Sequence, residues 1–103
     1  MRIETDFGIY DGVFLKTDRY AADNSVYIQA WNWMDGPIAT LTVCLDDRML
    51  EKNETYLDTN NCPWVVDFMV NNGLAELTGK MRASGFCVYP SVKLNMAEIG
   101  KVG

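Results

Sequence analysis

The chain contains no histidine and only three cysteines and three prolines in 103 residues. The lack of histidine removes the commonest general base of enzymes and the commonest metal ligand. The cysteines, Cys44, Cys62 and Cys87, are widely spaced and form no C-x-x-C pair. A zinc site would need all three thiolates and a carboxylate besides, so we expect no metal and no cofactor.

Long apolar runs are also missing, because no segment approaches the roughly 20 residues that a membrane-spanning helix needs. Residues 1–6 show no apolar stretch of the kind found in a secretory signal peptide. We therefore expect a cytoplasmic protein with reduced thiols and no membrane partner. Positive charge is scarce, since nine Lys and Arg against 14 Asp and Glu give a net charge of −5. That sign argues against a nucleic-acid partner.

The remaining composition is that of a globular protein, with 49% hydrophobic and 22% charged residues. The length fits one domain, residues 1–103. No glycine-rich phosphate loop and no G-x-S-x-G motif occurs in the sequence. Catalysis would need an acid and a cation, such as Asp58 with Lys80 or Arg82, to converge in a cleft. We take this only as a third hypothesis, behind two kinds of binding protein.

Alternating and β-branched segments dominate the chain and predict strands. The clearest are residues 26–33 and 38–45, which the turn 34–37 joins into a β-hairpin. In the second of them we expect Ala39, Leu41, Val43 and Leu45 to face the core and the face with Thr42 to be half exposed. Further strands are expected at residues 3–9, 13–16, 56–58, 75–83 and 86–94. Between and within them we expect a turn at Asp11-Gly12, a loop at 17–25, a bulge or bend at Gly79, and an edge position or a bulge at Pro90.

One main helix is expected from about residue 62 to residue 72. Asn60 or Asn61 can cap its start, Pro63 suits its first turn, and Gly73 suits its end. Residues 96–102 predict a short final helical turn. A run of strands, one helix and two more strands indicates an α+β fold, with an antiparallel sheet of about five to six strands and one main helix packed on one face.

The strand at 26–33 has two dissimilar faces. One carries Val26, Ile28, Ala30 and Asn32, and the other carries Tyr27, Gln29, Trp31 and Trp33. We favour an arrangement in which the helix covers the large aromatic side chains and the small face is wetter. The alternative is an exposed aromatic platform, which would bind a partner or stack on a ligand. The candidate binding residues are therefore Tyr27, Gln29, Trp31 and Trp33, together with Trp64, which lies off the apolar stripe of the expected helix.

Four segments resemble a family of small bacterial proteins catalogued as a domain of unknown function, number 4313. They are Ala-Thr-Leu-Thr-Val at 39–43, Leu-Asp-Thr-Asn-Asn-Cys-Pro at 57–63, Asn-Gly-Leu-Ala at 72–75 and Ser-Gly-Phe-Cys-Val-Tyr-Pro at 84–90. The resemblance covers about residues 26–94 and implies a cytoplasmic accessory protein of a conjugative element or phage. It implies no mechanism. Because Cys62 and Cys87 both lie in these motifs, a redox pair stays open, subject to their distance.

Our leading hypothesis is a non-enzymatic protein-binding accessory module whose partner is another protein or a second copy of the chain. The alternative is a small-ligand or carbohydrate-binding domain that uses the same aromatic residues, with Gln29 and Asn32 as polar contacts. A flat aromatic patch favours the first hypothesis, and a concave one favours the second.

Overall fold

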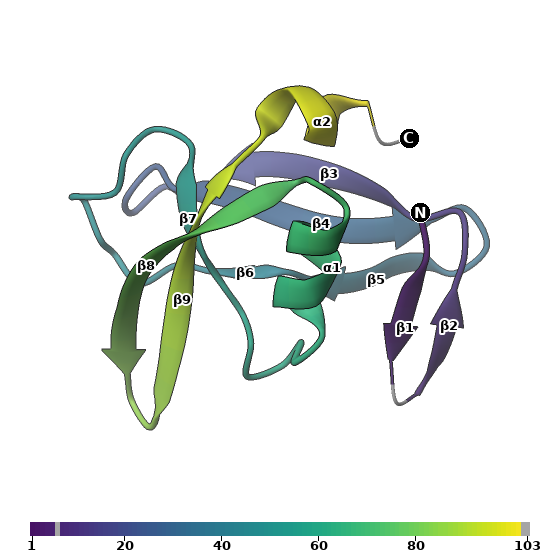
Figure 1. Ribbon diagram of the computed structural model, residues 1–103, viewed down its shortest axis with the longest axis horizontal. Coiled ribbons are helices and arrows are strands. Elements are labelled where there is room, and N and C mark those ends of the chain that lie inside the picture. The colour runs from purple at the N-terminus through teal and green to yellow at the C-terminus, as the bar shows by residue number, and fades with distance from the viewer. Residues whose placement is uncertain (6, 102–103) are drawn as a thin grey trace.

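The computed structural model describes residues 1–5 and 7–101, and within them strands far outweigh helices (Figure 1). Nine strands form three separate antiparallel sheets, and the two helices are short. The expected α+β fold, with one sheet and one main helix on its face, is therefore wrong. Strands supply about half of the described residues, and packing between sheets replaces most of the helix-on-sheet packing that we expected.

The first sheet pairs β1 (Ile3–Thr5) with β2 (Gly8–Tyr10), and the second has the order β3-β4-β5. Its strands are β3 (Phe14–Arg19), β4 (Val26–Asn32) and β5 (Gly36–Thr40). The third sheet has the order β6-β7-β9-β8, with β6 (Thr42–Val43), β7 (Glu54–Leu57), β8 (Ala75–Ser84) and β9 (Cys87–Leu94). The helices are α1 (Val65–Asn71) and α2 (Met96–Gly100).

The predicted hairpin at 26–33 and 38–45 exists as β4 and β5, but its second strand divides at Leu41. The Leu41 N–H donates to the carbonyl of Ile28 (2.9 Å), whereas its carbonyl accepts from the N–H of Asp58 (2.9 Å). Leu41 thus belongs to both larger sheets and joins them. Thr42, expected on a half-exposed face, is buried because its hydroxyl accepts from the Ile28 N–H and meets the Tyr20 hydroxyl.

The hydrophobic core fills the space between the second and third sheets. Its fully buried side chains come from both sheets and from α1, and include Ile28, Leu41, Leu57, Met69 and Val92. A further bond joins the two sheets across this space, since the Thr55 hydroxyl donates to the Val26 carbonyl (2.8 Å).

Helix α1 is shorter than predicted and begins later. Its N-cap position is Trp64, with no side-chain cap, so neither Asn60 nor Asn61 caps it as we expected. Asn61 instead bonds to Asp58 in the preceding turn. The predicted end is confirmed, because Gly73 has a φ of +70°, and the N–H of Leu74 donates to the carbonyl of Met69 (2.9 Å).

The N-terminal prediction is wrong in detail. Where one strand was expected at residues 3–9, Ile3–Thr5 and Gly8–Tyr10 form two strands that pair with each other, and Gly12 lies in the loop that follows them. The segment expected as a loop from residue 17 is strand up to Arg19, where β3 runs alongside β4. Helix α2 matches the expected final turn up to Gly100, and Val102 lies outside the described residues.

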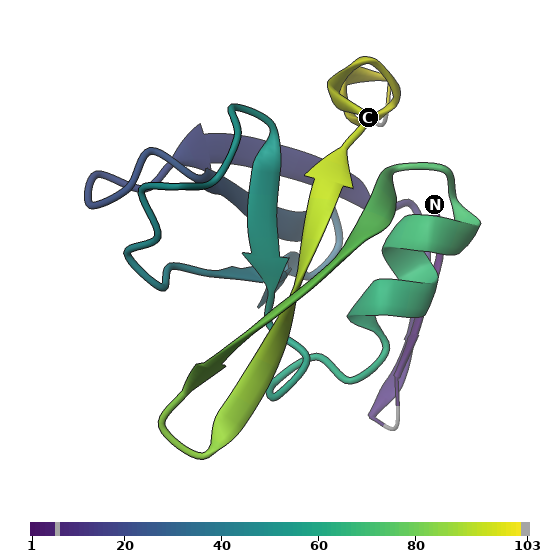
Figure 2. The same ribbon diagram turned by 60° about the vertical axis from the view of Figure 1, so that its left-hand side comes forward.

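Strands β8 and β9 form a long hairpin whose end extends away from the other sheets (Figure 2). Gly79 has a φ of +85°, and the register shifts between Leu77 and Met81, so the predicted bulge is confirmed. Pro90 lies in β9, a central strand, at the end of this irregular stretch. We expected Pro90 on an edge strand or at a bulge, and the structure places it beside the bulge of β8. Neither helix is long and apolar enough to cross a membrane.

Candidate functional site

Strand β4 alternates strictly between buried and partly exposed residues. Val26, Ile28 and Ala30 are at most 1% exposed and lie in the core, while Tyr27, Gln29 and Trp31 face outward and are half-buried. The favoured arrangement, with the large aromatics in the core, is therefore wrong. Thr42 and Thr55 of the third sheet bond to the backbone of β4 and hold that sheet against it, so the small face of β4 lies in the core between the two sheets.

The outward face of β4 continues onto β3, which the sequence did not assign to the site. Phe14 is the cross-strand partner of Trp31, and Lys16 is the partner of Gln29. We call the set Phe14, Lys16, Gln29, Trp31 and Trp33 the aromatic face. The signal for its two missed members was present, since Phe14 and Lys16 are two residues apart on a predicted strand.

Trp31 is held in place by two neighbours on this face. Its indole Nε1 donates to Gln29 Oε1 (2.5 Å), and the Lys16 ammonium lies 3.6 Å from the ring centroid. A cation over an indole ring at an exposed site is worth about 0.5–1 kcal/mol. These contacts fix the ring on the sheet and leave the ring face under Lys16 covered.

Trp33 is the most exposed member of the aromatic face. Its side chain is 88% exposed, and its ring lies tilted against that of Phe14, with centroids 5.1 Å apart. Trp33 is the first residue of the turn between β4 and β5, and Met34, the next residue, is 92% exposed. The two side chains therefore present an apolar surface at the end of the second sheet.

The turn that carries Trp33 is anchored by the buried side chain of Asn32. The Asn32 amide nitrogen donates to the carbonyl of Asp11 (3.2 Å) and to the Asp35 carboxylate (3.0 Å). Its amide oxygen accepts from the Asp35 N–H (2.6 Å). An exposed tryptophan on a fixed turn is preorganised for contact, since little freedom remains to be lost on binding.

Two of the polar groups expected to contact a carbohydrate ligand, the Asn32 amide and Gln29 Oε1, already bond to other parts of the protein. The Asn32 amide serves the turn, and Gln29 Oε1 serves Trp31. Four hollows in the surface are lined by residues of other elements, and none of these four includes Tyr27, Gln29, Trp31 or Trp33. The aromatic face therefore lies outside these four hollows.

Tyr27 and Trp64 do not join the exposed part of the aromatic face. Tyr27 packs edge-on against Tyr20, with centroids 5.5 Å apart, and the Tyr20 hydroxyl bonds to Thr42. Burial raises the pKa of Tyr20. Trp64 lies before α1, edge-on to Phe68 at 6.0 Å, and lines hollows beside the β1–β2 hairpin. The structure thus separates Trp64 from the other candidates.

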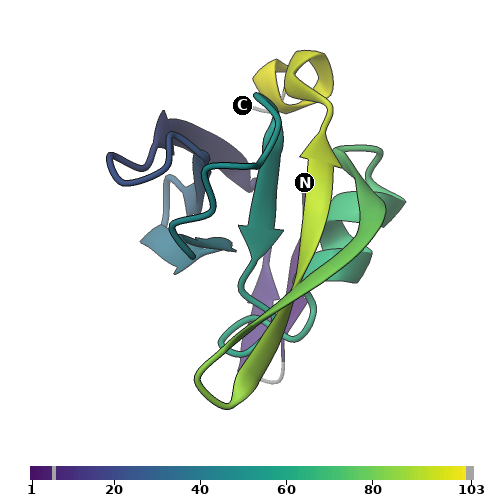
Figure 3. The ribbon, with the colours of Figure 1, turned by 90° about the vertical axis from the view of Figure 1, so that its left-hand side faces the viewer.

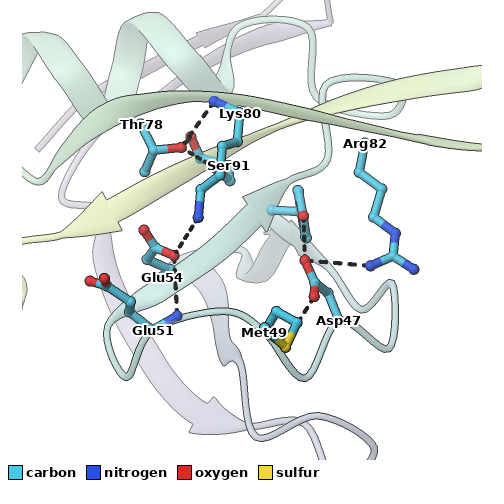
Figure 4. A network of polar contacts seen from close by, with 9 residues as sticks. Asp47, Met49, Glu51, Glu54, Thr78, Lys80, Arg82 and Ser91 are labelled. Atoms are coloured by element: carbon cyan, nitrogen blue, oxygen red, sulfur yellow. Dashed lines mark hydrogen bonds and ion pairs between the residues drawn. The ribbon is translucent and has the colours of Figure 1, made fainter.

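The acid and cations considered for catalysis have separate partners. The Asp58 carboxylate accepts from the N–H (3.2 Å) and the side-chain amide (2.9 Å) of Asn61. Lys80 pairs with Glu54 (3.2 Å), and Arg82 pairs with Asp47 (3.4 Å), as Figure 4 shows. The first contact lies within the turn after β7, the second joins β8 to β7, and the third joins β8 to the loop before β7. All three therefore stabilise the fold.

Asp47, the partner of Arg82, accepts further hydrogen bonds. The Tyr56 hydroxyl donates to Asp47 Oδ2 (2.6 Å), and this bond holds the pKa of the carboxyl below its usual range. The Met49 N–H and Arg82 act in the same direction. Burial raises the pKa of Tyr56, and the Asp47 charge adds to that effect. The group therefore fixes the loop after β6 onto the third sheet.

All three cysteines are free thiols. Cys62 is buried in the core, where its Sγ lies 3.6 Å from the carbonyl oxygen of Thr40. Loss of solvation raises the pKa of Cys62 to about 11. Within residues 1–5 and 7–101, no three Cys, Asp or Glu side chains gather in an arrangement that could hold a metal ion.

A family model described as Domain of unknown function (DUF4313) matches residues 14–102. The matched stretch runs from Phe14 on β3 through both larger sheets and α2, so it contains the whole aromatic face. No curated protein and no solved structure matches the chain.

Proposed function

We propose that this chain, which belongs to the DUF4313 family, is a protein-binding accessory module that contacts its partner through the aromatic face. The observation that carries the proposal is the 88% exposure of Trp33, whose ring lies tilted against Phe14 at the start of an anchored turn. Burying a tryptophan removes 150–250 Å² from water, which contributes about 4–6 kcal/mol before the costs of association.

The chemistry of the surface favours a protein over other partners. Lys16 is its one cation, and that ammonium is already engaged with the Trp31 ring. A strand of nucleic acid would meet a chain of net charge −5. An apolar pocket in a partner protein, with an acidic group near Lys16, would complement the surface. Trp and Tyr are the commonest residues at the energetic centre of such contacts.

The biological setting is part of the same proposal. The family resemblance supports a bacterial, cytoplasmic protein carried by a mobile element, whose partner would be a host protein or another protein of that element. Because the proposed setting is bacterial, the search for the partner should use a bacterial lysate.

The test is a quantitative pull-down from a bacterial lysate with three baits: the wild type, Trp33→Ala and Phe86→Ala. Phe86 is the matched control, because it is fully exposed on the separate β8–β9 hairpin. We expect one stable protein on the wild type and on Phe86→Ala, and its loss from Trp33→Ala. Equal recovery on a folded Trp33→Ala bait would refute the proposal.

A further inference from the structure

We propose that the outer edge of β8 pairs with the same strand of a second copy, which gives a dimer with two-fold symmetry. This surface is distinct from the aromatic face, which lies on the second sheet. Strand β8 is the longest strand among the described residues, and β9 is its one neighbour in the sheet. Eight of its ten residues are exposed. Such an edge is a template for pairing with another chain.

The backbone of β8 has a regular set of groups that point away from β9. The N–H of Asn95 donates to the carbonyl of Leu74 (2.8 Å). Hydrogen-bonded pairs alternate along an antiparallel ladder, so the N–H and C=O of Ala75 and Leu77 point outward. At the other end, Ser84 and Cys87 close a two-residue turn, and by the same alternation Met81 and Ala83 point outward.

One register brings all four of these residues into pairs. In a two-fold antiparallel pairing, residues at equal distances from the axis face each other. With the axis at Gly79, Leu77 faces Met81 of the second copy, and Ala75 faces Ala83. Leu77 and Met81 are exposed, so their outward N–H and C=O groups can form ladder hydrogen bonds with the second copy. Ala75 is only 4% exposed, so the ladder ends before it.

The side chains are complementary in the same register. Glu76 faces Arg82 of the second copy, and because the pairing is symmetric this ion pair occurs twice. Arg82 uses one nitrogen for Asp47 at 3.4 Å and has a side chain that is 44% exposed. A guanidinium has five N–H donors, so it can also reach a second carboxylate. Leu77 (53% exposed) and Met81 (60% exposed) would cover each other.

The two halves of β8 have different surroundings: a hollow lies beside the first half, and the second half projects from the molecule. The first half borders a hollow of about 550 Å³ lined by Val70, Leu77 and Leu94 among others, between α1 and the sheet. The second half belongs to the hairpin end that extends from the molecule (Figure 3). The pairing places the extended half of each copy, with Met81, along the hollow of the other.

The bulge of residues 78–80 lies on the axis of the proposed dimer. Bulges usually protect edges by twisting them away from other chains. Here the bulge interrupts the pairing only at its centre, where Gly79 offers no side chain and open space surrounds it. The two flanking segments, residues 76–77 and 81–82, carry the contact.

The test is sedimentation equilibrium on the purified chain over a wide concentration range. We expect the wild type to shift from one chain to two as the concentration rises. Glu76→Arg and Arg82→Glu should each weaken the dimer about tenfold or more, because each creates two like-charged pairs. The double variant should restore it. Lys52→Glu, a charge reversal on an exposed loop, should leave the dimer unchanged.

A backbone variant tests the pairing without changing charge. Met81→Pro removes an N–H that points away from β9 and faces Leu77 of the second copy, so the hairpin should fold and the dimer should be lost. A wild type that stays monomeric up to about 1 mM overturns the proposal. So does a dimer that the folded charge variants leave intact, because such a dimer would use another surface.

Discussion

The rings of Phe14 and Trp33 lie with their centroids 5.1 Å apart and their planes at 34°. The two residues come from β3 and from the turn after β4, and they meet because the register pairs Phe14 with Trp31, two residues before Trp33. Their contact joins the exposed aromatic residues of two segments into one surface. The surface is therefore a product of strand pairing, and the aromatic strand alone does not make it.

Because the small face of β4 is buried, alanine substitutions at two paired residues of β4 and β3 should lower the free energy of unfolding by different amounts. Ile28→Ala removes a side chain with no exposed surface and should lower the free energy of unfolding by about 2–5 kcal/mol. Thr17→Ala, at the cross-strand partner on β3, removes an exposed hydroxyl and methyl group and should change it by less than about 0.5 kcal/mol. Urea denaturation measures both. Equal costs would mean that the small face of β4 is not in the core.

The bond between Tyr56 and Asp47 predicts a pH-dependent contribution to stability. The bond holds the pKa of Asp47 below its usual range. The stabilisation is therefore complete above the unfolded value of about 4 and is lost as the pH falls through the lower pKa of the folded state. Asp47→Asn should lower stability at neutral pH, and its difference from the wild type should shrink on acidification. Asp46→Asn, an exposed neighbour, serves as the control, and a difference that grows with acid would contradict the assignment.

Burial of Cys62 predicts that it reacts more slowly than the other two thiols. Its pKa of about 11 leaves about one thiol in a thousand ionised at pH 8. Brief treatment with iodoacetamide, followed by peptide mass spectrometry, should label Cys44 and Cys87 before Cys62. In urea all three should react at similar rates. Early labelling of Cys62 in the folded protein would show that it is not in the core.

Local signals in the sequence predicted the elements best where a specific residue enforces the conformation. The helix end at Gly73, the bulge at Gly79 and the turn between β4 and β5 all require backbone shapes that glycine provides, and all are present. The start of α1 was missed because Asn61 bonds to Asp58 and caps no helix. A local capping signal does not reveal which of two nearby turns will use it.

The division of the chain into three sheets and the composition of the aromatic face depended on contacts between distant residues. Alternation along 38–45 gives no sign of the break at Leu41, which arises because its N–H and C=O bond to two different sheets. The faces of β4 were identified correctly, but their orientation was not. The orientation follows from the packing of the third sheet against the small face of β4, and that contact is a property of the assembled fold.

The most direct test of the account is the affinity of the captured partner for purified variants, measured by isothermal titration calorimetry. Loss of Trp33 should cost more than about 2 kcal/mol, so Trp33→Ala should weaken binding by about 30-fold or more. Phe86→Ala should bind within about twofold of the wild type, and both variants should retain the wild-type circular dichroism spectrum. Binding by a folded Trp33→Ala that equals the wild type, or an equal loss in Phe86→Ala, would contradict the proposal that the aromatic face is the contact surface.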